Sequence, residues 1–392
     1  MLSEKRIVLG VSGGIAAYKS VEISRRLVDA GAFVSPIMTS AAKKFIGEVT
    51  LSALASEPVK SSLWDDDDPI PHTTLGQQAD LILVAPATAK LIGTYAAGIS
   101  NDLLSATLLA TRAPVILCPA MHTEMWEHPA VQDNINTLKR RGVVIVDPED
   151  GILAGGDLGK GRLAGVEAIL SEVESTLTKK DLSNLKLLIT AGGTREPIDP
   201  VRYITNKSSG KQGYALAKAA HLRGAEVTLV TTMPDDAPFG VEVLCAETAS
   251  DMRNVVMGIQ SEYDVIIMAA AIADFRPAEI SEQKIKKTKG STNLELENTH
   301  DFLIDLGKGK RPEQTIVGFA AETEHLEENA LEKLERKHLD LIVANNVSHP
   351  GVGFSYDTNE VTIMSQDSKW TLPLSDKRII ADGILDALLE VR

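Results

Sequence analysis

The sequence is short of cysteine, of positive charge and of long apolar runs. It has two cysteines, Cys118 and Cys245, among 392 residues, which excludes a disulfide framework and a zinc site made of cysteines. No apolar run in it approaches the ~18 to 20 residues that a membrane-spanning helix needs. The net charge of −14 repels nucleic acids and anionic membranes, so a phosphate-bearing ligand needs a local basic cluster. With a strand-like start in place of a signal peptide, we expect a cytoplasmic protein that binds neither nucleic acid nor membrane.

The sequence also lacks two familiar nucleotide-binding motifs. The glycine-rich turn VSGG does not have the GxGxxG spacing, and Thr39 and Ser40 stand where a dinucleotide-binding fold has an acidic residue. Hydroxyl groups there suit a mononucleotide phosphate, although from the residues alone a plain tight turn is an equally good interpretation. In RYITNKSSGKQG, residues 202–213, Thr205 and Gln212 occupy positions where a Walker A loop requires glycine and then Ser or Thr.

Both halves of the chain repeat one order of elements. Residues 5–38 and residues 186–231 each contain an apolar strand, a glycine-rich turn, a helix followed by a Gly-Ala pair, and a second strand. Further short apolar runs alternate with helical patterns, which indicates parallel sheets that are covered on both faces. We therefore predict an α/β protein with two Rossmann-like, three-layer domains and mostly parallel sheets. The predicted domains span residues 1–178 and 186–392, with a linker at 179–185, and ligands should bind beyond the carboxyl ends of the strands.

The first half carries several segments that follow predicted strand ends. GVSGGIAAYK, MTSAAKKFI, His72 before Thr73, APATAKLIGTYAAGISNDLL and PAMHTEMW occur in this order. Together they resemble the flavin-dependent cysteine decarboxylases of coenzyme A and lantibiotic biosynthesis, over most of residues 5–165. The resemblance implies a flavodoxin-like, trimeric domain in which His72 is the catalytic acid or base. It implies that FMN is held by Ser12, Gly13, Gly14, Thr39, Ser40, Ala87, Thr88 and Ala120.

Two positions depart from that pattern. His122 stands where the family usually has an asparagine that helps to hold the substrate, and an imidazole can still donate a hydrogen bond. Gly155 stands in the flap-like segment GILAGGDLGKGR where the coenzyme A branch carries a proton-donating cysteine. Since glycine cannot transfer a proton, water or a nearby side chain such as Asp157 or Lys160 must do so. Otherwise this half is inactive or stops at the enethiol.

Basic residues gather at two places in the second half. The segment KIKKTKG contains Lys284, Lys286, Lys287 and Lys289. On a predicted helix, Lys333 and Lys337 lie four residues apart, a spacing at which like charges cost about 0.2–0.5 kcal/mol, and Lys333 has no acidic residue three or four positions away. An anionic ligand would explain such a pair. A solvated hairpin and a tolerated surface pair are the alternatives.

Longer segments of the second half carry a second resemblance. ITAGGTREPIDPVRYITNKSSGKQG, AAAIADFRP, KIKK, GFAAET and KHLDLIVANN are similar to the phosphopantothenate–cysteine ligases, over essentially all of residues 186–346. The Gly-Lys loop is then the family's own anion loop. The resemblance implies a dimeric domain that uses CTP and Mg²⁺ to form an acyl-cytidylate, which the amine of cysteine then attacks.

The resemblance also implies roles for individual residues. Arg202 and Asn206 contact the phosphopantothenate carboxylate and its acyl-nucleotide, and Lys284 acts on the transition state. Asp274 holds the metal ion or the nucleotide. Alternatively, Arg202 is a surface partner of Asp199, and Asp274 is a turn former at a strand end. The implied CTP site consists of Ser208, Ala270, Asp274, Lys284, Phe319, Lys333 and Lys337.

The two resemblances together imply a bifunctional enzyme of coenzyme A synthesis with small-molecule substrates. Its ligase half joins 4′-phosphopantothenate to cysteine, and its FMN-dependent half decarboxylates the product to 4′-phosphopantetheine. A homo-oligomer is expected. The competing hypotheses are a pair of nucleotide-binding modules without chemistry, a nicotinamide-dependent dehydrogenase, and a ligase whose flavin half is inactive or stops early because of Gly155.

Overall fold

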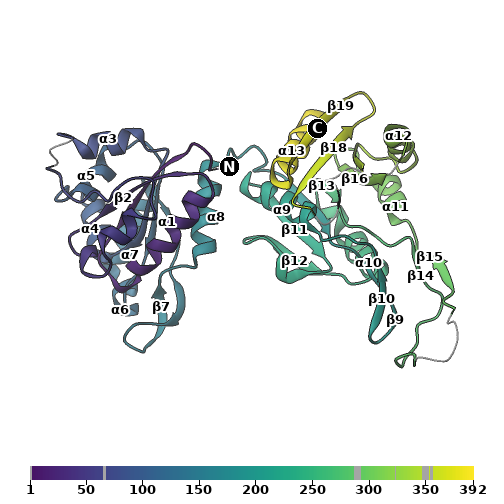
Figure 1. Cartoon of the computed structure of the whole chain (residues 1–392), viewed down its shortest axis with the longest axis horizontal. Coiled ribbons are helices and arrows are strands. Elements are labelled where there is room, and N and C mark those ends of the chain that lie inside the picture. The colour runs from purple at the N-terminus through teal and green to yellow at the C-terminus, as the bar shows by residue number, and fades with distance from the viewer. Residues whose placement is uncertain (1, 65–67, 287–292, 323, 347–352, 354–355) are drawn as a thin grey trace. The chain divides into compact units, whose positions relative to one another are not determined.

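The computed structural model describes residues 2–64, 68–286, 293–322, 324–346, 353 and 356–392. The chain forms two compact units, Met1–Lys179 and Lys180–Arg392, which are called here the first and the second unit (Figure 1). Within those described ranges, no helix combines the length and the apolar character that crossing a membrane requires.

A five-stranded parallel sheet forms the centre of the first unit, in the order β2-β1-β3-β4-β5. Its strands are β1 Arg6–Val11, β2 Phe33–Met38, β3 Leu81–Ala87, β4 Val115–Pro119 and β5 Val144–Ile145. Along β3, Leu81 and Leu83 enter one hydrophobic core while Ile82 and Val84 enter the core on the opposite face. Burial on both faces is why this strand appears in the sequence as one continuous apolar run.

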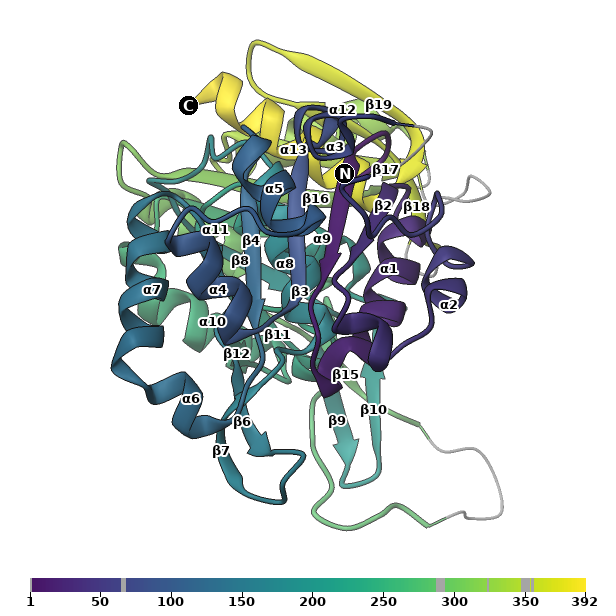
Figure 2. The same ribbon diagram turned by 90° about the vertical axis from the view of Figure 1, so that its left-hand side faces the viewer.

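Helices cover both faces of this sheet. α1 and α8 contribute to one core, and α3, α4, α5 and α7 contribute to the other. Figure 2 shows α1 and α7 on opposite sides of the strands. The predicted three-layer architecture is thereby confirmed for this unit. The helices are α1 Lys19–Asp29, α2 Glu48–Ser52, α3 Pro71–Gln78, α4 Ala89–Ala96, α5 Leu103–Ala110, α6 Thr123–Glu127, α7 Pro129–Arg140 and α8 Val166–Leu177.

An antiparallel hairpin, called here the flap, follows the sheet of the first unit. It consists of β6 Glu149–Ile152 and β7 Leu158–Arg162. The flap lies against the segment after β4, because the Met121 N–H donates to the Gly161 carbonyl at 3.0 Å. A Cβ at Gly161 would come within 2.2 Å of the Met121 carbonyl oxygen, so only glycine permits this approach.

The second unit contains an eight-stranded sheet in the order β12-β11-β8-β13-β16-β17-β18-β19. The first six strands in this order run parallel, and β17, β18 and β19 pair antiparallel. The mostly parallel sheet is confirmed, and the antiparallel extension was not predicted. The strands are β8 Lys186–Ala191, β11 Glu226–Thr231, β12 Glu242–Cys245, β13 Val265–Met268, β16 Thr315–Glu322, β17 Leu341–Asn346, β18 Thr358–Met364 and β19 Lys369–Asp376.

Helices also cover both faces of the second sheet. α9 and α13 pack on one core, and α10, α11 and α12 pack on the other. Two small antiparallel pairs project from the unit (Figure 1), namely β9 with β10 and β14 with β15. The helices are α9 Lys211–Leu222, α10 Ala249–Ile259, α11 Phe302–Gly309, α12 Leu326–Arg336 and α13 Lys377–Val391. The small strands are β9 Arg195–Asp199, β10 Arg202–Thr205, β14 Phe275–Pro277 and β15 Leu296–Asn298.

Candidate active sites

A cavity of about 700 Å³ opens in the first unit at the carboxyl ends of the parallel strands. The turn after β1, the loop after β2, the start of α4, the segment after β4 and the flap all contribute to its lining. Ala87 does not line it, because this residue is fully buried, and its carbonyl accepts from the Ala120 N–H at 3.1 Å. The residues predicted for FMN that do line the cavity are Ser12, Gly13, Gly14, Thr39, Ser40, Thr88 and Ala120.

Ser12 fixes the glycine-rich turn to the end of β3. Its hydroxyl donates to the Pro86 carbonyl at 2.8 Å and accepts from the Thr88 N–H at 3.0 Å, and the residue is buried. Thr88 in turn caps α4, since its side chain accepts from the Leu91 N–H at 3.4 Å. With its only hydrogen donated to Pro86, the Ser12 hydroxyl positions the turn and leaves ligand binding to the backbone.

Three basic residues that the sequence analysis did not single out line the same cavity: Lys19, Lys90 and Arg162. Lys19 Nζ donates to the Leu163 carbonyl at 3.2 Å. Burial lowers the pKa of Lys19, and the neighbouring Arg162 lowers it further. These residues form the local basic cluster that a phosphate ligand needs in a strongly acidic chain. The signal for one of them was present, since Lys19 is the lysine that ends GVSGGIAAYK.

His122 lies at the start of α6 and lines the cavity beside the flap. Its Nδ1 is 2.6 Å from Glu124 Oε2, and its Nε2 is 3.4 Å from Asp157 Oδ2 of the flap. The hydrogen bond with Glu124 raises the pKa of His122, and the charges of Glu124 and Asp157 raise it further. The two carboxylates therefore stabilise the protonated form of the imidazole at the wall of the cavity relative to a histidine without such partners.

His72 is in a different position from the one its predicted role suggests. It is the second residue of α3, it is half-buried, and it is not among the described residues that line the cavity of its own unit. Its Nδ1 is buried without a hydrogen-bond partner in the described part of the chain. A buried polar atom without a partner is costly, so this nitrogen is a site where a water molecule, a ligand or another protein group can bind.

A second cavity, of about 310 Å³, lies beyond the carboxyl ends of β8 and β11 in the second unit. The predicted residues Asn206 and Ser208 line it, together with Arg195 and Lys207, two basic residues that the sequence analysis did not assign. Asn206 Nδ2 donates to the Ile272 carbonyl at 3.1 Å, which holds this loop beside the end of β13. The loop leads directly into the N-terminus of α9, a position that favours anions.

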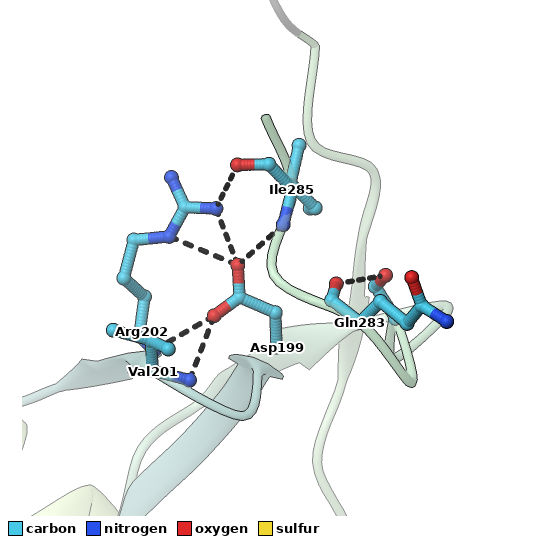
Figure 3. A network of polar contacts seen from close by, with 6 residues as sticks. Asp199, Val201, Arg202, Gln283 and Ile285 are labelled. Carbon is cyan, nitrogen blue, oxygen red and sulfur yellow. Dashed lines mark hydrogen bonds and ion pairs between the residues drawn. The ribbon is translucent and has the colours of Figure 1, made fainter. Parts of the chain in front are cut away.

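Asp199 joins the β9–β10 hairpin to the segment that carries Lys284 (Figure 3). One of its oxygens accepts from the backbone N–H groups of Val201 and Arg202, both at 2.9 Å. The other accepts from the Arg202 guanidinium, with Nε at 3.0 Å, and from the Ile285 N–H at 3.1 Å. Arg202 also donates to the Ile285 carbonyl at 3.0 Å.

Two roles were considered for Arg202, contact with the substrate and pairing with Asp199, and the structure shows the pairing. The ion pair with Arg202 holds the pKa of the buried Asp199 carboxyl well below its usual range. Arg202 is therefore the partner of Asp199, as in the alternative above, although Asp199 is buried rather than at the surface. Because Arg202 also grips the backbone of Ile285, it positions the residue that follows Lys284.

The prediction that Lys333 lacks an acidic partner is wrong. Lys333 Nζ lies 2.5 Å from Glu322 Oε1, at the end of β16, and Lys337 Nζ lies 2.8 Å from Asp301 Oδ2, just before α11. Both partners lie outside α12, so a search along the helix misses them. The lysine pair therefore does not by itself indicate an anionic ligand.

Three of the remaining predicted ligase residues lie in or after strands of the second sheet. Ala270 and Asp274 follow β13, and Phe319 is within β16. Lys284 is exposed. In the described ranges of the chain, no three His, Cys, Asp or Glu side chains are grouped as metal ligands, so Asp274 has no protein-built metal cluster around it. Of the other members of the KIKKTKG cluster, Lys286 is exposed, and Lys287 and Lys289 lie outside the described residues.

Comparison with known proteins finds a matching family model for each of the two units. A family model described as "Flavoprotein" matches residues 1–178, and one described as "DNA/pantothenate metabolism flavoprotein C-terminal domain" matches residues 182–391. The "Coenzyme A biosynthesis bifunctional protein CoaBC" of Mycobacterium tuberculosis (strain H37Rv) is 45% identical over 98% of this chain and 96% of its own length. That of Bacillus subtilis (strain 168) is 45% identical over 99% of this chain and 97% of its own length.

The chain belongs to this family of bifunctional proteins of coenzyme A biosynthesis. Membership confirms both resemblances that the sequence carried, and the α/β class of the two halves. Among solved structures, one described as an FMN-dependent cysteine decarboxylase, SpaF, is 28% identical over 44% of this chain and 99% of its own, with a TM-score of 0.39.

The cavity of this family member's first unit suits a flavin mononucleotide. Its size is within the ~300–1,000 Å³ that small-molecule sites usually have. The hydroxyls of Thr39 and Ser40 and the basic side chains in the lining suit a phosphate, and the absence of a Cβ at Gly13 lets the turn after β1 and the loop after β2 meet. Apolar side chains such as Met121 and Met125 line the remainder, which suits a flat aromatic ring.

Proposed function

We propose that this chain catalyses two successive steps of coenzyme A biosynthesis. The second unit joins 4′-phosphopantothenate to L-cysteine with CTP, through an acyl-cytidylate, and the first unit decarboxylates the product to 4′-phosphopantetheine. The observation that carries the proposal is that one chain holds two separate cavities at the carboxyl ends of its sheets, while it aligns almost end to end with bifunctional relatives. A shared chain is chemically sensible because the first product is the second substrate.

In the first unit, FMN would serve as the sink for the electrons of the substrate thiol, which allows CO₂ to leave. Thr39, Ser40 and the backbone of the Ser12–Gly14 turn would hold its phosphate, with Lys19, Lys90 and Arg162 balancing the negative charge. Thr88 and Ala120 would border the rest of the cofactor. Ala87 would support the site from below, since it is buried under the cavity wall.

His72 would act as acid or base from a neighbouring copy of the chain. It does not line the cavity of its own unit, and its Nδ1 lacks a partner there. A homo-oligomer, with trimeric flavin units and dimeric ligase units, would bring it to another copy's cavity. A chain that acted as a monomer would leave His72 without a role in decarboxylation.

In the second unit, Asn206 and Ser208 would contact the acyl-nucleotide from the smaller cavity, and Lys284 would stabilise the charge that develops on the carbonyl. Arg202 would hold the Lys284 segment and approach the phosphopantothenate carboxylate. Ala270 and Phe319, which are not among the described residues that line the smaller cavity, would contact the nucleotide outside it. Asp274 would hold Mg²⁺ jointly with the nucleotide phosphates, as is usual for this ion.

Lys333 and Lys337 can serve the triphosphate only by exchanging partners. Each already forms an ion pair with a carboxylate, Lys333 with Glu322 and Lys337 with Asp301. A triphosphate would have to replace these carboxylates or be added beside them. We retain the two lysines in the proposed CTP site on this condition.

The proposed functional domains are residues 1–178 for the decarboxylase and 186–392 for the ligase, with 179–185 as the linker. We propose that the protein acts in the cytoplasm on small molecules, without nucleic-acid or membrane partners. The comparisons do not favour a chain with ligase activity alone, because the matching relatives are named as bifunctional.

Omission of single components tests the proposal. The purified protein is incubated with phosphopantothenate, cysteine, CTP and Mg²⁺, and pyrophosphate and CO₂ are measured in parallel. Both should appear, both should vanish without CTP, and CO₂ alone should vanish in flavin-free protein. Pyrophosphate without CO₂ in the flavin-loaded protein would reduce the function to ligation, and CO₂ release that does not need CTP would contradict the order of the steps.

A further inference from the structure

We infer that His122 donates, from Nε2, the proton that the substrate carbon needs after CO₂ has left, and that Asp157 of the flap positions it for this step. The inference rests on the proposed decarboxylase function and names the group that does the work of a flap cysteine in this chain. Four observations on the cavity wall carry it.

The first observation is the placement of one carboxylate at each ring nitrogen of His122. Glu124 Oε2 is 2.6 Å from Nδ1, and Asp157 Oδ2 is 3.4 Å from Nε2. A carboxylate can only accept, so both contacts are favourable together only when both nitrogens carry hydrogen. The imidazolium that results keeps a transferable proton on Nε2, the atom that faces the flap.

The second observation concerns the space at Gly155. A Cβ built at Gly155 would be 3.1 Å from His122 Nε2 and 3.0 Å from Asp157 Oδ2. A side chain on residue 155 would therefore project into the space that the imidazole nitrogen faces. A proton-donating side chain at residue 155 and the imidazole of His122 would thus reach the same place in the cavity. Glycine at 155 leaves that space to the imidazole.

The third observation is that His122 belongs to the cavity wall and has access to water. It lines the cavity together with Ala154 of the flap, and its side chain is 40% exposed. Asp157 and Glu124 are more exposed than His122, at 67% and 80%. After the ring has given up its Nε2 proton, water can restore it through Asp157, the carboxylate that faces Nε2.

The fourth observation removes the other flap candidate, Lys160. Its Nζ lies 6.0 Å from the centre of the Trp126 ring and 3.8 Å from Asp147 Oδ2. These contacts place it beside Trp126 and Asp147, and it is not among the described residues that line the cavity. The charged groups that act on the His122 ring in the described part of the chain are Glu124 from α6 and Asp157 from the flap.

The proton transfer balances without any other reactant. Loss of CO₂ leaves an enethiolate, in which a carbon–carbon double bond is conjugated with the thiolate sulfur. The electron pair of that double bond forms a new C–H bond at the carbon that lost CO₂, the Nε2–H bond breaks, and a sulfur lone pair forms a C=S bond. His122 becomes neutral, and no oxidation or reduction occurs in this step. If the step fails, the released product is an enethiol that is two hydrogens lighter than phosphopantetheine.

The test uses flavin-loaded full-length protein with phosphopantothenoylcysteine as substrate, and it weighs the product. Wild type should give phosphopantetheine. His122→Asn should keep its flavin and release CO₂, but should lower the thiol-to-enethiol ratio at least about 100-fold, the lower end of the usual loss for a general acid. Adding Gly155→Cys to His122→Asn should restore the thiol, because a thiol at 155 enters the vacated space. Lys160→Gln serves as the matched flap control and should match wild type.

A second readout does not depend on turnover. In flavin-free protein, the His122 ring is titrated by NMR, and Asp157→Asn should lower its pKa while Lys160→Gln should not. An unchanged pKa in Asp157→Asn would overturn the positioning role. A wild-type thiol-to-enethiol ratio in His122→Asn would overturn the donor role. A wild-type protein that releases no CO₂ would instead contradict the proposed function, and the titration would still decide whether Asp157 acts on His122.

Discussion

Substitution of Gly13 by alanine should weaken flavin binding and leave the rest of the molecule intact. A Cβ at Gly13 would lie 2.3 Å from the Ala41 Cβ and 2.8 Å from the Ala41 carbonyl carbon. Both atoms belong to the loop after β2, and neither can rotate away. An ordinary contact begins at 3.4 Å, so the two loops must separate by about 1 Å.

The cost of that separation sets the expected magnitude. Overpacking of this kind costs about 1–3 kcal/mol. In the free protein the loops can relax apart, but a phosphate held by both loops forces them together again, so the cost should appear in binding. At about 1.4 kcal/mol for each tenfold change, the affinity for FMN should fall roughly 5- to 150-fold.

The assay is a titration of FMN into flavin-free protein, followed by the quenching of flavin fluorescence. Gly47→Ala is the matched control, because its Cβ would meet only the Thr50 Oγ1, at 3.7 Å, Gly47 has an extended backbone with φ of −78°, and it is not among the described residues that line the cavity. This variant should bind FMN within about twofold of wild type, in line with the small effects of substitutions that create no clash. If Gly13→Ala binds FMN as tightly as the wild type does, the idea that these two loops hold the cofactor is refuted.

Four further predictions concern both units. Lys284→Gln should slow ligation by at least about 100-fold while flavin colour stays, as measured by pyrophosphate release; ligation near the wild-type rate would make Lys284 a surface residue. His72→Asn should reduce CO₂ release by about 100-fold or more and keep FMN; undiminished release would remove it from the mechanism. Asp199→Asn should slow ligation but not the decarboxylation of added phosphopantothenoylcysteine, and equal losses in both would indicate general unfolding. Because the Glu124 hydrogen bond raises the pKa of His122, the thiol fraction of the product should be full below that pKa and fall as pH rises through it. Glu124→Gln should move this fall to lower pH, and an unmoved profile would show that another group titrates.

The repeated strand–turn–helix units could be predicted because their signals are local. α1 and α9 are followed by Gly31 and Gly224, with φ of 91° and 92°, as the Gly-Ala pairs indicate. The hairpin of β18 and β19 was missed, because its more buried residues alternate with half-buried ones in β18 and with exposed ones in most of β19. A search for continuous buried runs does not detect that pattern.

The sequence predicts those parts of the site that are formed by residues close together in the chain. It does not predict contacts between residues that only the fold brings together. The glycine-rich turn and the loop after β2 lie where their motifs indicate. The partners of Lys333 and Lys337 come from other elements, so helical spacing gave the wrong answer for Lys333. The contact of Gly155 with His122 likewise depends on how the flap folds back over the segment after β4. These relations are tertiary, and no local pattern contains them.

The most direct test of the whole account uses cysteine that carries ¹³C in its carboxyl group. Full-length protein is given this cysteine with phosphopantothenate, CTP and Mg²⁺, and the products are weighed. The account predicts unlabelled phosphopantetheine, with the ¹³C recovered as CO₂ and one pyrophosphate released for each product. Label retained in phosphopantothenoylcysteine would show that the first unit does not decarboxylate, and no incorporation of cysteine at all would contradict the proposed ligase activity.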